Sequence, residues 1–210
     1  MKRGYDSSVP VKDAPNWYVC GFYMGGMTPH IWTDAEIAAI TARELNPIYP
    51  YIGVDSAAEA ARVASEMLAR AIELKLPKGK SLCIDTETNV YNAFLVTLDH
   101  MITVGGYSLL NYGSLAYVIQ NAPTSGGRWS ADWTDVQHID DGHNIVGTQF
   151  ASSTQLGTDY DASVFDDSVP FAPNPNFVLP VKDAIDQSLK LIDSASAGLL
   201  QAHSLLKPYA

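Results

Sequence analysis

Ser81-Leu82-Cys83-Ile84-Asp85-Thr86-Glu87-Thr88 is the stretch that decides the fold of this chain. It begins as a short apolar run, which predicts a buried strand, and it ends in two carboxylates. Side chains alternate between the faces of a strand, so Asp85 and Glu87 share one face, roughly 6–7 Å apart at Cα. The pKa values of two neighbouring carboxyl groups move apart, so that one group can act as an acid while the other stays ionised. The competing interpretation is a strand end whose solvated acids cap the next helix.

Strands and helices alternate on both sides of this stretch. Apolar periodicity predicts helices over residues 57–76, 91–104 and 114–121, and another helix starts at Thr33 and continues to Leu45. Strands are expected around Tyr5, Val19, Ile48, Leu82, Leu109, Trp129, Val146 and Val164. Because strands that alternate with helices pair in parallel through crossovers, the predicted fold class is α/β, a compact, irregular (β/α)8 barrel of the TIM type.

The chain is expected to divide into three parts. Residues 1–171 form the barrel, and residues 172–180, which begin Ala-Pro-Asn-Pro-Asn, form a proline-rich linker. In residues 181–207 apolar side chains recur every three or four positions, which predicts an added C-terminal amphipathic helix. Docking on the barrel, self-association with a second copy and anchoring to a larger particle all stay open for this helix.

Composition narrows the possible partners. The chain has 210 residues, 47% of them hydrophobic, which suits one domain with a sizeable core. Its net charge is −10 and its pI about 4.7, so nucleic acid and anionic membranes are poor partners. No apolar run is as long as a membrane span.

Two further features of the sequence bear on the compartment. Cys20 and Cys83 lie inside apolar runs and on different predicted strands, so both are expected to be free, buried thiols. The N-terminus MKRGYD lacks the apolar region of a signal peptide. The product is therefore expected to be cytoplasmic when made, whatever its later destination.

Several polar residues fall at the ends of predicted strands, where active sites of this fold lie. Asp6 ends the first strand, Asp85 and Glu87 end the fourth, and Asp132 follows the sixth. Gln149 lies in the seventh strand and Asp161 begins the eighth. Aromatic side chains are expected nearby at Tyr49, Tyr51, Tyr112, Trp129 and Trp133. Carboxylates for the glycosidic bond and ring faces for stacking are what a sugar-cleaving cleft needs, although aromatic rings also fill barrel cores.

A set of motifs on successive strands resembles glycoside hydrolase family 25, the cellosyl-type lysozymes that include many phage endolysins. The motifs are GYDSS at 4–8, DTE at 85–87, WSADW at 129–133, TQF at 148–150 and DASVF at 161–165. Residues 22–26 and 32–36 are also similar to a related group of glycoside-hydrolase-like domains of unknown function. Together the motifs cover roughly residues 4–166.

The resemblance implies roles for individual residues. Glu87 matches the general acid that protonates the leaving oxygen between two amino sugars, and Asp85 matches its partner carboxylate. Asp6 and Asp161 match acids that line the same cleft. The implied substrate is bacterial cell-wall peptidoglycan, reached after release of the protein from the cell. The chain departs from the family pattern at Asp132 and Trp133, and before Gln149, where Gly147 and Thr148 replace the expected aromatic residue.

Other kinds of site have weaker support. The loop that holds Asp135, His138, Asp140, Asp141 and His143 could suggest a metal, but its spacing matches no zinc pattern. It is therefore expected to be a solvated loop, with no metal site and no cofactor. Two functions stay open: a muramidase that cleaves peptidoglycan, and a catalytically silent barrel that binds a glycan or serves as a structural, phage-associated component. Retention of Asp85 and Glu87 favours the first, and the altered sixth and seventh strands favour the second.

Overall fold

A computed structural model of the chain describes residues 1–53, 55–86, 92–140 and 142–177. Within these limits the stretch that opens at Ser81 forms strand β4 (Ser81–Asp85), as its sequence predicts. Glu87 and the predicted C-terminal helix over 181–207 lie outside the described residues, so both stay predictions.

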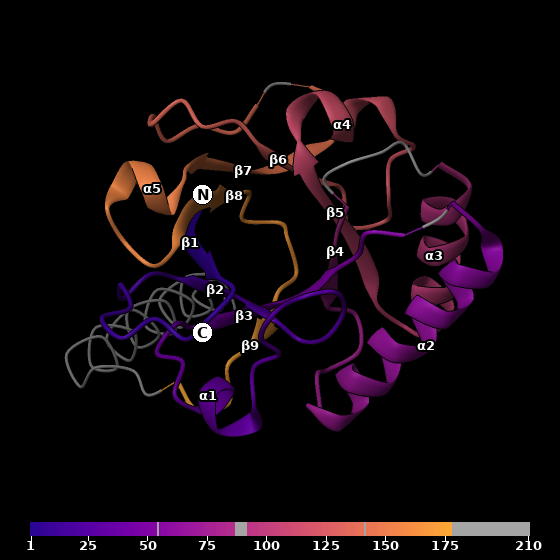
Figure 1. Cartoon of the computed structure of the whole chain (residues 1–210), viewed down its shortest axis with the longest axis horizontal. Coiled ribbons are helices and arrows are strands. Elements are labelled where there is room, and N and C mark those ends of the chain that lie inside the picture. Colours follow the sequence, from indigo (N-terminus) through magenta and orange to yellow (C-terminus); the bar gives the residue numbers. More distant parts are fainter. Residues whose placement is uncertain (54, 87–91, 141, 178–210) are drawn as a thin grey trace, which may run out of the picture. The chain divides into compact units, whose positions relative to one another are not determined.

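Eight strands close into a barrel, which confirms the predicted fold class (Figure 1). Neighbouring strands pair around the ring in chain order, and the pairing of β2 with β3 and of β1 with β8 closes it. Besides β4, the strands of the ring are β1 (Lys2–Ser7), β2 (Val19–Tyr23), β3 (Glu44–Pro50), β5 (Ser108–Ser114), β6 (Arg128–Ala131), β7 (Ile145–Ala151) and β8 (Asp161–Phe165). Every strand lies where the sequence predicts one.

Strand β8 differs from the all-parallel prediction, because it runs antiparallel to both β7 and β1. Residues 152–160, which join β7 to β8, hold only the single-turn helix α5 (Ser153–Leu156). A parallel return needs a crossover of a dozen or more residues, whereas this shorter connection reverses the chain. The start of β8 therefore lies beside the end of β1, where Asp161 and Asp6 are register partners.

The longest helices follow the early strands. α2 (Ala57–Glu73) and α3 (Asn92–Val104) pack side by side on one flank of the barrel (Figure 1). The shorter α4 (Leu115–Gln120) is capped by Ser114 and follows β5. Helix α1 (Asp34–Ala38) starts at the expected capping box of Thr33 and Glu36, but it does not continue to Leu45. Leu45 belongs instead to β3, where it pairs with Cys20.

Apolar side chains form separate cores on the two faces of the sheet. The core inside the barrel gathers Val19, Ile48, Cys83, Leu110, Tyr112, Trp129, Phe165, Val169 and Phe171. A larger core fills the space between the outer face of the sheet and helices α1, α2 and α3. Cys20 and Cys83 are buried and free, as predicted. None of the helices in the described part of the chain has the length and hydrophobicity of a membrane span.

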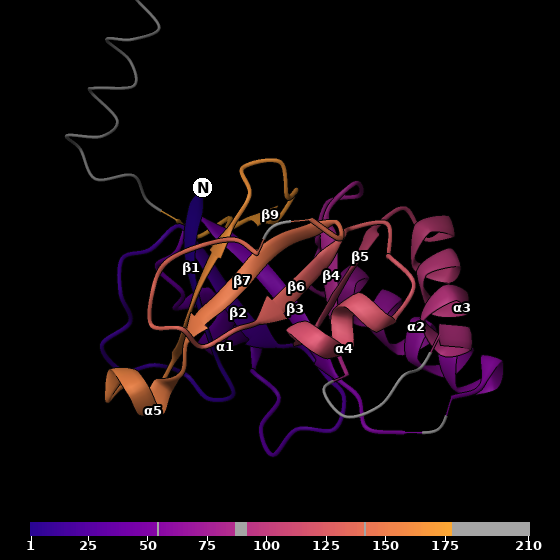
Figure 2. The same cartoon turned by 90° about the horizontal axis from the view of Figure 1, so that it is seen from above.

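The first residues of the predicted linker are part of the barrel unit. Ala172–Pro173 form a short strand, β9, which pairs antiparallel with the start of β3. Asn174 is buried, and its side-chain amide donates to the carbonyl oxygens of Ile40 and Ala42. These hydrogen bonds hold a segment that its prolines alone would leave extended, so the compact unit runs from Met1 to Asn176. Figure 2 shows β9 at the opposite end of the barrel from α5.

Candidate active site

Three carboxylates from different strands line one small cavity at the end of the barrel where the parallel strands finish. Asp6 comes from β1, Asp85 from β4 and Asp161 from the start of the antiparallel β8. The cavity has a volume of about 40 Å³, and its remaining lining residues are Tyr23, Ile48, Tyr112 and Trp129. Strand alternation directs these side chains into the barrel, so the structure brings together acids that the sequence placed on separate strands.

Gln149 connects two of these acids through its side-chain amide. Its Nε2 donates to both Asp6 carboxylate oxygens at 3.3 Å and to Oδ2 of Asp161 at 3.4 Å. Its Oε1 accepts from the Tyr112 hydroxyl and from the Trp133 indole N–H, each at 2.8 Å. With only 1% of its surface exposed, Gln149 is a buried hub that fixes the spacing of the carboxylates.

The predicted residues Tyr112 and Trp129 form an aromatic floor beneath the acids. Their ring centroids are 4.5 Å apart, and Trp129 in turn contacts Phe165 at 5.1 Å. Trp129 is buried, so its ring is part of the barrel core as well as of the cavity wall. Its indole N–H is a buried donor with no partner in the part of the chain that the structure describes. An unpaired buried donor costs free energy unless a ligand or water accepts from it.

A larger hollow adjoins the cavity and shares Tyr23 and Asp85 with it. Its volume is about 300 Å³, which reaches the range of small-molecule sites. Tyr51 lines this hollow, but its ring stacks face to face on Phe94 with centroids 4.5 Å apart. The face that stacks on Phe94 is therefore not open to a sugar, although Tyr51 does lie at the expected end of the barrel.

Tyr49 is not in the cleft, contrary to the prediction. It packs in the core outside the barrel, where its hydroxyl donates to the Glu66 carboxylate of α2. Burial and this hydrogen bond raise the pKa of Tyr49 to about 12. The reason is strand alternation: Ile48 points into the barrel, so its neighbour must point out.

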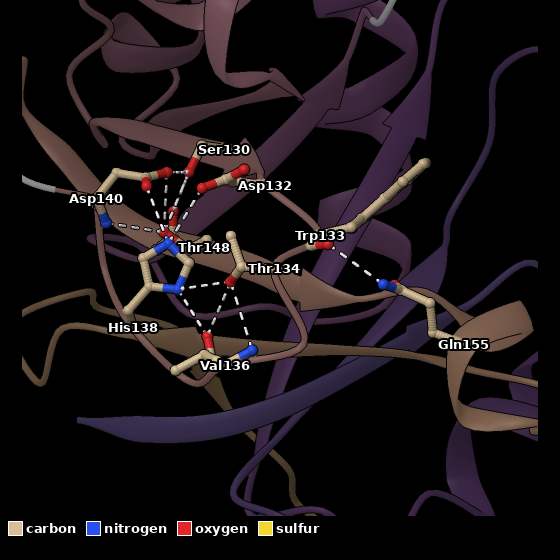
Figure 3. A network of polar contacts seen from close by, with 10 residues as sticks. Ser130, Asp132, Trp133, Thr134, Val136, His138, Asp140, Thr148 and Gln155 are labelled. Carbon is tan, nitrogen blue, oxygen red and sulfur yellow. Dashed lines mark hydrogen bonds and ion pairs between the residues drawn. The ribbon is translucent and has the colours of Figure 1, made fainter.

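Asp132 also lies on the outer side, away from the cavity lining. Its Oδ2 is 3.2 Å from Nε2 of His138, on the loop that follows β6. Nε2 of His138 is also 3.0 Å from Oδ1 of Asp140, so two carboxylates face one ring nitrogen (Figure 3). The hydrogen bond to the Val136 carbonyl, and then those to Asp140 and Asp132, raise the pKa of His138, against the opposing effect of burial.

Trp133 is at the rim of the site, as expected. Its side chain is 56% exposed, yet its indole N–H is held by Gln149. Its backbone carbonyl accepts from the Gln155 amide at 3.2 Å. Figure 3 shows Trp133 directed away from the His138 cluster. A fixed, exposed indole beside the carboxylates is suited to stacking on a sugar ring.

Two residues of the site were missed in the sequence. Tyr23, at the end of β2, lines both hollows. Gly21 lies opposite Asp6, and a Cβ there would come within 2.5 Å of the Asp6 Cβ and 2.9 Å of Ile48 Cδ1. A glycine inside an apolar strand signals a close approach of this kind, and it could have indicated Gly21.

Cys83 lies in the barrel core below the carboxylates and is not a nucleophile. Burial, followed by the charges of Asp85 and Asp6, raises the pKa of its thiol well above the ordinary value. A buried thiol of this kind stays protonated and unreactive.

Comparisons with known proteins give the fold but no sequence family. No family model and no curated protein matches the sequence. An uncharacterised B. stearothermophilus protein of known structure aligns with a TM-score of 0.66 and 18% identity over 82% of this chain and 100% of its own. Rv2525c, a Tat-secreted Mycobacterium tuberculosis protein solved with L-tartrate, aligns with a TM-score of 0.61 and 10% identity over 82% of this chain and 98% of its own.

The modular Cpl-1 endolysin, solved in complex with a peptidoglycan analogue, aligns with a TM-score of 0.58 and 16% identity. The alignment covers 80% of this chain and 56% of the endolysin, so the chain spans little more than half of that protein. At these identities the likeness shows that the chain shares its barrel fold with these proteins.

Proposed function

We propose that this chain is a peptidoglycan-cleaving glycoside hydrolase, a lysozyme-like N-acetylmuramidase of the endolysin type. The observation that carries the proposal is the convergence of Asp6, Asp85 and Asp161 on one cavity above an aromatic floor. This cavity lies at the end of the barrel where enzymes of this fold hold their active sites. The fold shared with an endolysin that is complexed with a peptidoglycan analogue supports the choice of substrate.

The chemistry divides between two neighbouring acids. Glu87, two positions after Asp85 in the sequence, is the general acid that protonates the leaving glycosidic oxygen. Asp85 orients the substrate's own 2-acetamido group, or stabilises the positive charge that develops when this group attacks the anomeric carbon. Direct attack by a carboxylate is the other mechanism that the same residues allow.

The remaining residues bind and orient the substrate. Asp6 and Asp161, bridged by the Gln149 amide, accept hydrogen bonds from sugar hydroxyl and amide groups. The unpaired indole N–H of Trp129 is the donor that a carbonyl oxygen of the substrate requires. Trp133 stacks on a sugar ring at the rim. The partner is bacterial cell-wall peptidoglycan, on which the protein acts after its release from the cytoplasm.

Hydrolysis of purified peptidoglycan tests this proposal. The assay follows turbidity, and mass analysis of borohydride-reduced fragments identifies the sugar at each new reducing end. The parent should release fragments that end in N-acetylmuramic acid. Glu87→Gln should lower turnover by about 10²–10⁴-fold, the usual share of general acid catalysis. Asp85→Asn should also lower turnover, because it removes the charge that stabilises the developing positive charge. Asp13→Asn, which makes the same change on an exposed loop residue, should keep parental turnover.

Two outcomes oppose the proposal. If the folded Glu87→Gln variant kept the turnover of the parent, Glu87 would not be the general acid. A parent that releases no fragment from any wall, yet binds glycan, would support the silent, glycan-binding barrel instead. The departures from the family pattern at Asp132, Trp133 and Thr148 favour that second function.

A further inference from the structure

A second polar cluster lies outside the barrel, on the loop between β6 and β7. Asp132, His138 and Asp140 each offer one ligand atom, and these three atoms lie within 4.8 Å of one another. Figure 3 shows the three side chains directed toward a common point. They are spaced 132, 138 and 140 in the chain, which matches no zinc motif and explains why the sequence did not predict the set.

The hydrogen bonds of His138 determine which ring nitrogen is free to act as a ligand. Nδ1 lies 2.7 Å from the Val136 carbonyl oxygen, an atom that can only accept, so Nδ1 carries a proton. In the neutral ring, Nε2 then presents a lone pair to Asp132 Oδ2 at 3.2 Å and to Asp140 Oδ1 at 3.0 Å. Three electron-rich atoms this close repel one another unless a proton or a metal ion lies between them.

Groups behind the cluster hold Asp140 in place. Its Oδ2 accepts from the hydroxyl groups of Ser130 and Thr148, and its backbone N–H donates to Thr148 Oγ1 at 3.1 Å. Ser130 and Thr148 are fully buried on β6 and β7. Metal-binding histidines and carboxylates are typically oriented by such outer hydrogen bonds, including the bond from Nδ1–H to a backbone carbonyl.

The donor types and spacing distinguish between metals. Ca²⁺ and Mg²⁺ prefer oxygen ligands, whereas imidazole nitrogen suits transition metals and zinc. Ligands at about 2.1 Å from a Zn²⁺ ion lie about 3.0–3.4 Å from one another in octahedral to tetrahedral geometry. The two nitrogen–oxygen separations of the cluster, 3.2 and 3.0 Å, fall in this range.

We propose that Asp132, His138 and Asp140 form a binding site for a divalent transition-metal ion of the zinc type. Nε2 of His138 and one oxygen of each carboxylate supply three ligands, which leaves at least one position for water. The ion neutralises two adjacent negative charges, and in the described part of the chain the ion pairs of both acids are with His138 alone. It ties the loop to the end of β6, next to Trp133 at the rim of the cavity.

Zinc titration of the whole chain by calorimetry, after chelation and buffer exchange, tests the site. The parent should bind one Zn²⁺ per chain, and Co²⁺ should replace it with the visible absorption bands of a low-symmetry ion. His138→Gln should weaken binding by at least 100-fold, and the ring is exposed enough for this variant to fold. Asp132→Asn should weaken binding by at least 10-fold. Circular dichroism checks the fold of each variant.

Asp135→Asn is the matched control, because it removes one charge from the same loop outside the cluster. Its backbone φ of +59° is tolerated by asparagine, so its affinity for Zn²⁺ should match that of the parent. A parent that binds no Zn²⁺ at millimolar concentration would overturn the proposal and leave a protonated His138 between the two acids. Equal zinc affinities in the parent and His138→Gln would overturn it as well.

Discussion

The inner and outer faces of the barrel sheet carry the same residue types and use them differently. On the inner face the carboxylates of Asp6, Asp85 and Asp161 line one cavity, and the side chain of Gln149 links Asp6 and Asp161 to Tyr112. On the outer face Tyr49 hydrogen-bonds to Glu66 of a covering helix, and Asp132 faces His138 of a covering loop. Glu66 and Asp132 on the outer face thus contact side chains of covering elements, whereas Asp6 and Asp161 on the inner face share one neutral amide. The acids of the inner face therefore converge on a cavity, whereas those of the outer face connect covering elements to the barrel.

Replacing the shared amide by a carboxylate should have the largest effect. Gln149→Glu keeps the shape of the side chain but puts a further negative charge beside Asp6 and Asp161, and it removes the donor to both. The free energy of unfolding at pH 7 should fall by about 3 kcal/mol, as for an uncompensated buried charge. Urea denaturation measures this loss, and part of it should be recovered near pH 4, where the added carboxyl takes up a proton.

Gln155→Glu is the matched control for that change. Gln155 is exposed at the third position of α5, where its side chain accepts from the Ser152 backbone N–H, a role that glutamate also fills. The change also removes the exposed hydrogen bond from the Gln155 amide to the Trp133 carbonyl, so its free energy of unfolding should fall by no more than about 1 kcal/mol. Equal losses of stability in Gln149→Glu and Gln155→Glu would contradict the expectation that the Gln149 amide offsets the charges of Asp6 and Asp161.

Adding a methyl group at Gly21 should have the next largest effect. The new Cβ would lie 2.5 Å from the Asp6 Cβ, so the strands must shift. Gly21→Ala should lower the free energy of unfolding by about 1–3 kcal/mol and displace Asp6 from the cavity. Gly25→Ala, whose Cβ would meet only the Tyr49 ring edge at 3.1 Å, is the outer-face comparison and should cost less. Thermal unfolding measures the loss of stability in both variants. A larger loss in Gly25→Ala than in Gly21→Ala would contradict this expectation.

Removing single hydroxyl groups should separate the faces by function. Tyr112→Phe deletes the hydrogen bond to Oε1 of Gln149 and should cost about 1 kcal/mol in the free energy of unfolding. It should also reduce peptidoglycan turnover, because Gln149 positions Asp6 and Asp161. Tyr49→Phe deletes an outer hydroxyl and should leave turnover unchanged. An equal fall in turnover in both variants would contradict the expectation that only the inner-face hydroxyl group contributes to activity.

The smallest effect expected is on the pH dependence of stability. The hydrogen bond from Tyr49 lowers the pKa of Glu66 below its unfolded value, so this stabilisation is present above that value and is lost as the pH falls through the folded pKa. The raised pKa of Tyr49, about 12, adds stability below about pH 10 that is lost as the pH rises through 12. Tyr49→Phe should therefore make the melting temperature depend less on pH below pH 5 and above pH 10. Unchanged slopes at both ends would contradict this pairing.

The contrast between the two faces also shows which features could be predicted from the sequence. Apolar runs and helical periodicity predicted every strand of the barrel, because these signals are local. Strand alternation, together with the free-energy cost of burying a carboxylate in an apolar core, predicted that Asp85 faces the cleft. For Tyr49 the sequence offered no such indicator, because an aromatic ring suits a core on either face. Only the position of Ile48 inside the barrel decides the direction of Tyr49.

The features that could not be predicted depend on contacts between distant parts of the chain. The reversal of β8 follows from the length of one connection, and it brings Asp161 beside Asp6 across more than 150 residues. Gln149 acts as a hub only because strands from both ends of the chain meet there. The grouping of Asp132 with His138 requires the loop after β6 to fold back over Ser130 of β6 and Thr148 of β7. Asn174 likewise joins the barrel through carbonyl groups that have no signature in sequence.

A crystal structure of the Glu87→Gln variant with a peptidoglycan tetrasaccharide would show whether the inner-face cavity binds the substrate. Sugars should lie across the mouth of the inner-face cavity, with an acetamido group within about 2.6–3.2 Å of the Asp85 carboxylate and a sugar ring stacked on Trp133. Sugar bound only elsewhere, such as in the apolar groove lined by Phe22, Ile37 and Leu74, would contradict this expectation. Unliganded carboxylates at a saturating concentration of the tetrasaccharide would contradict it equally.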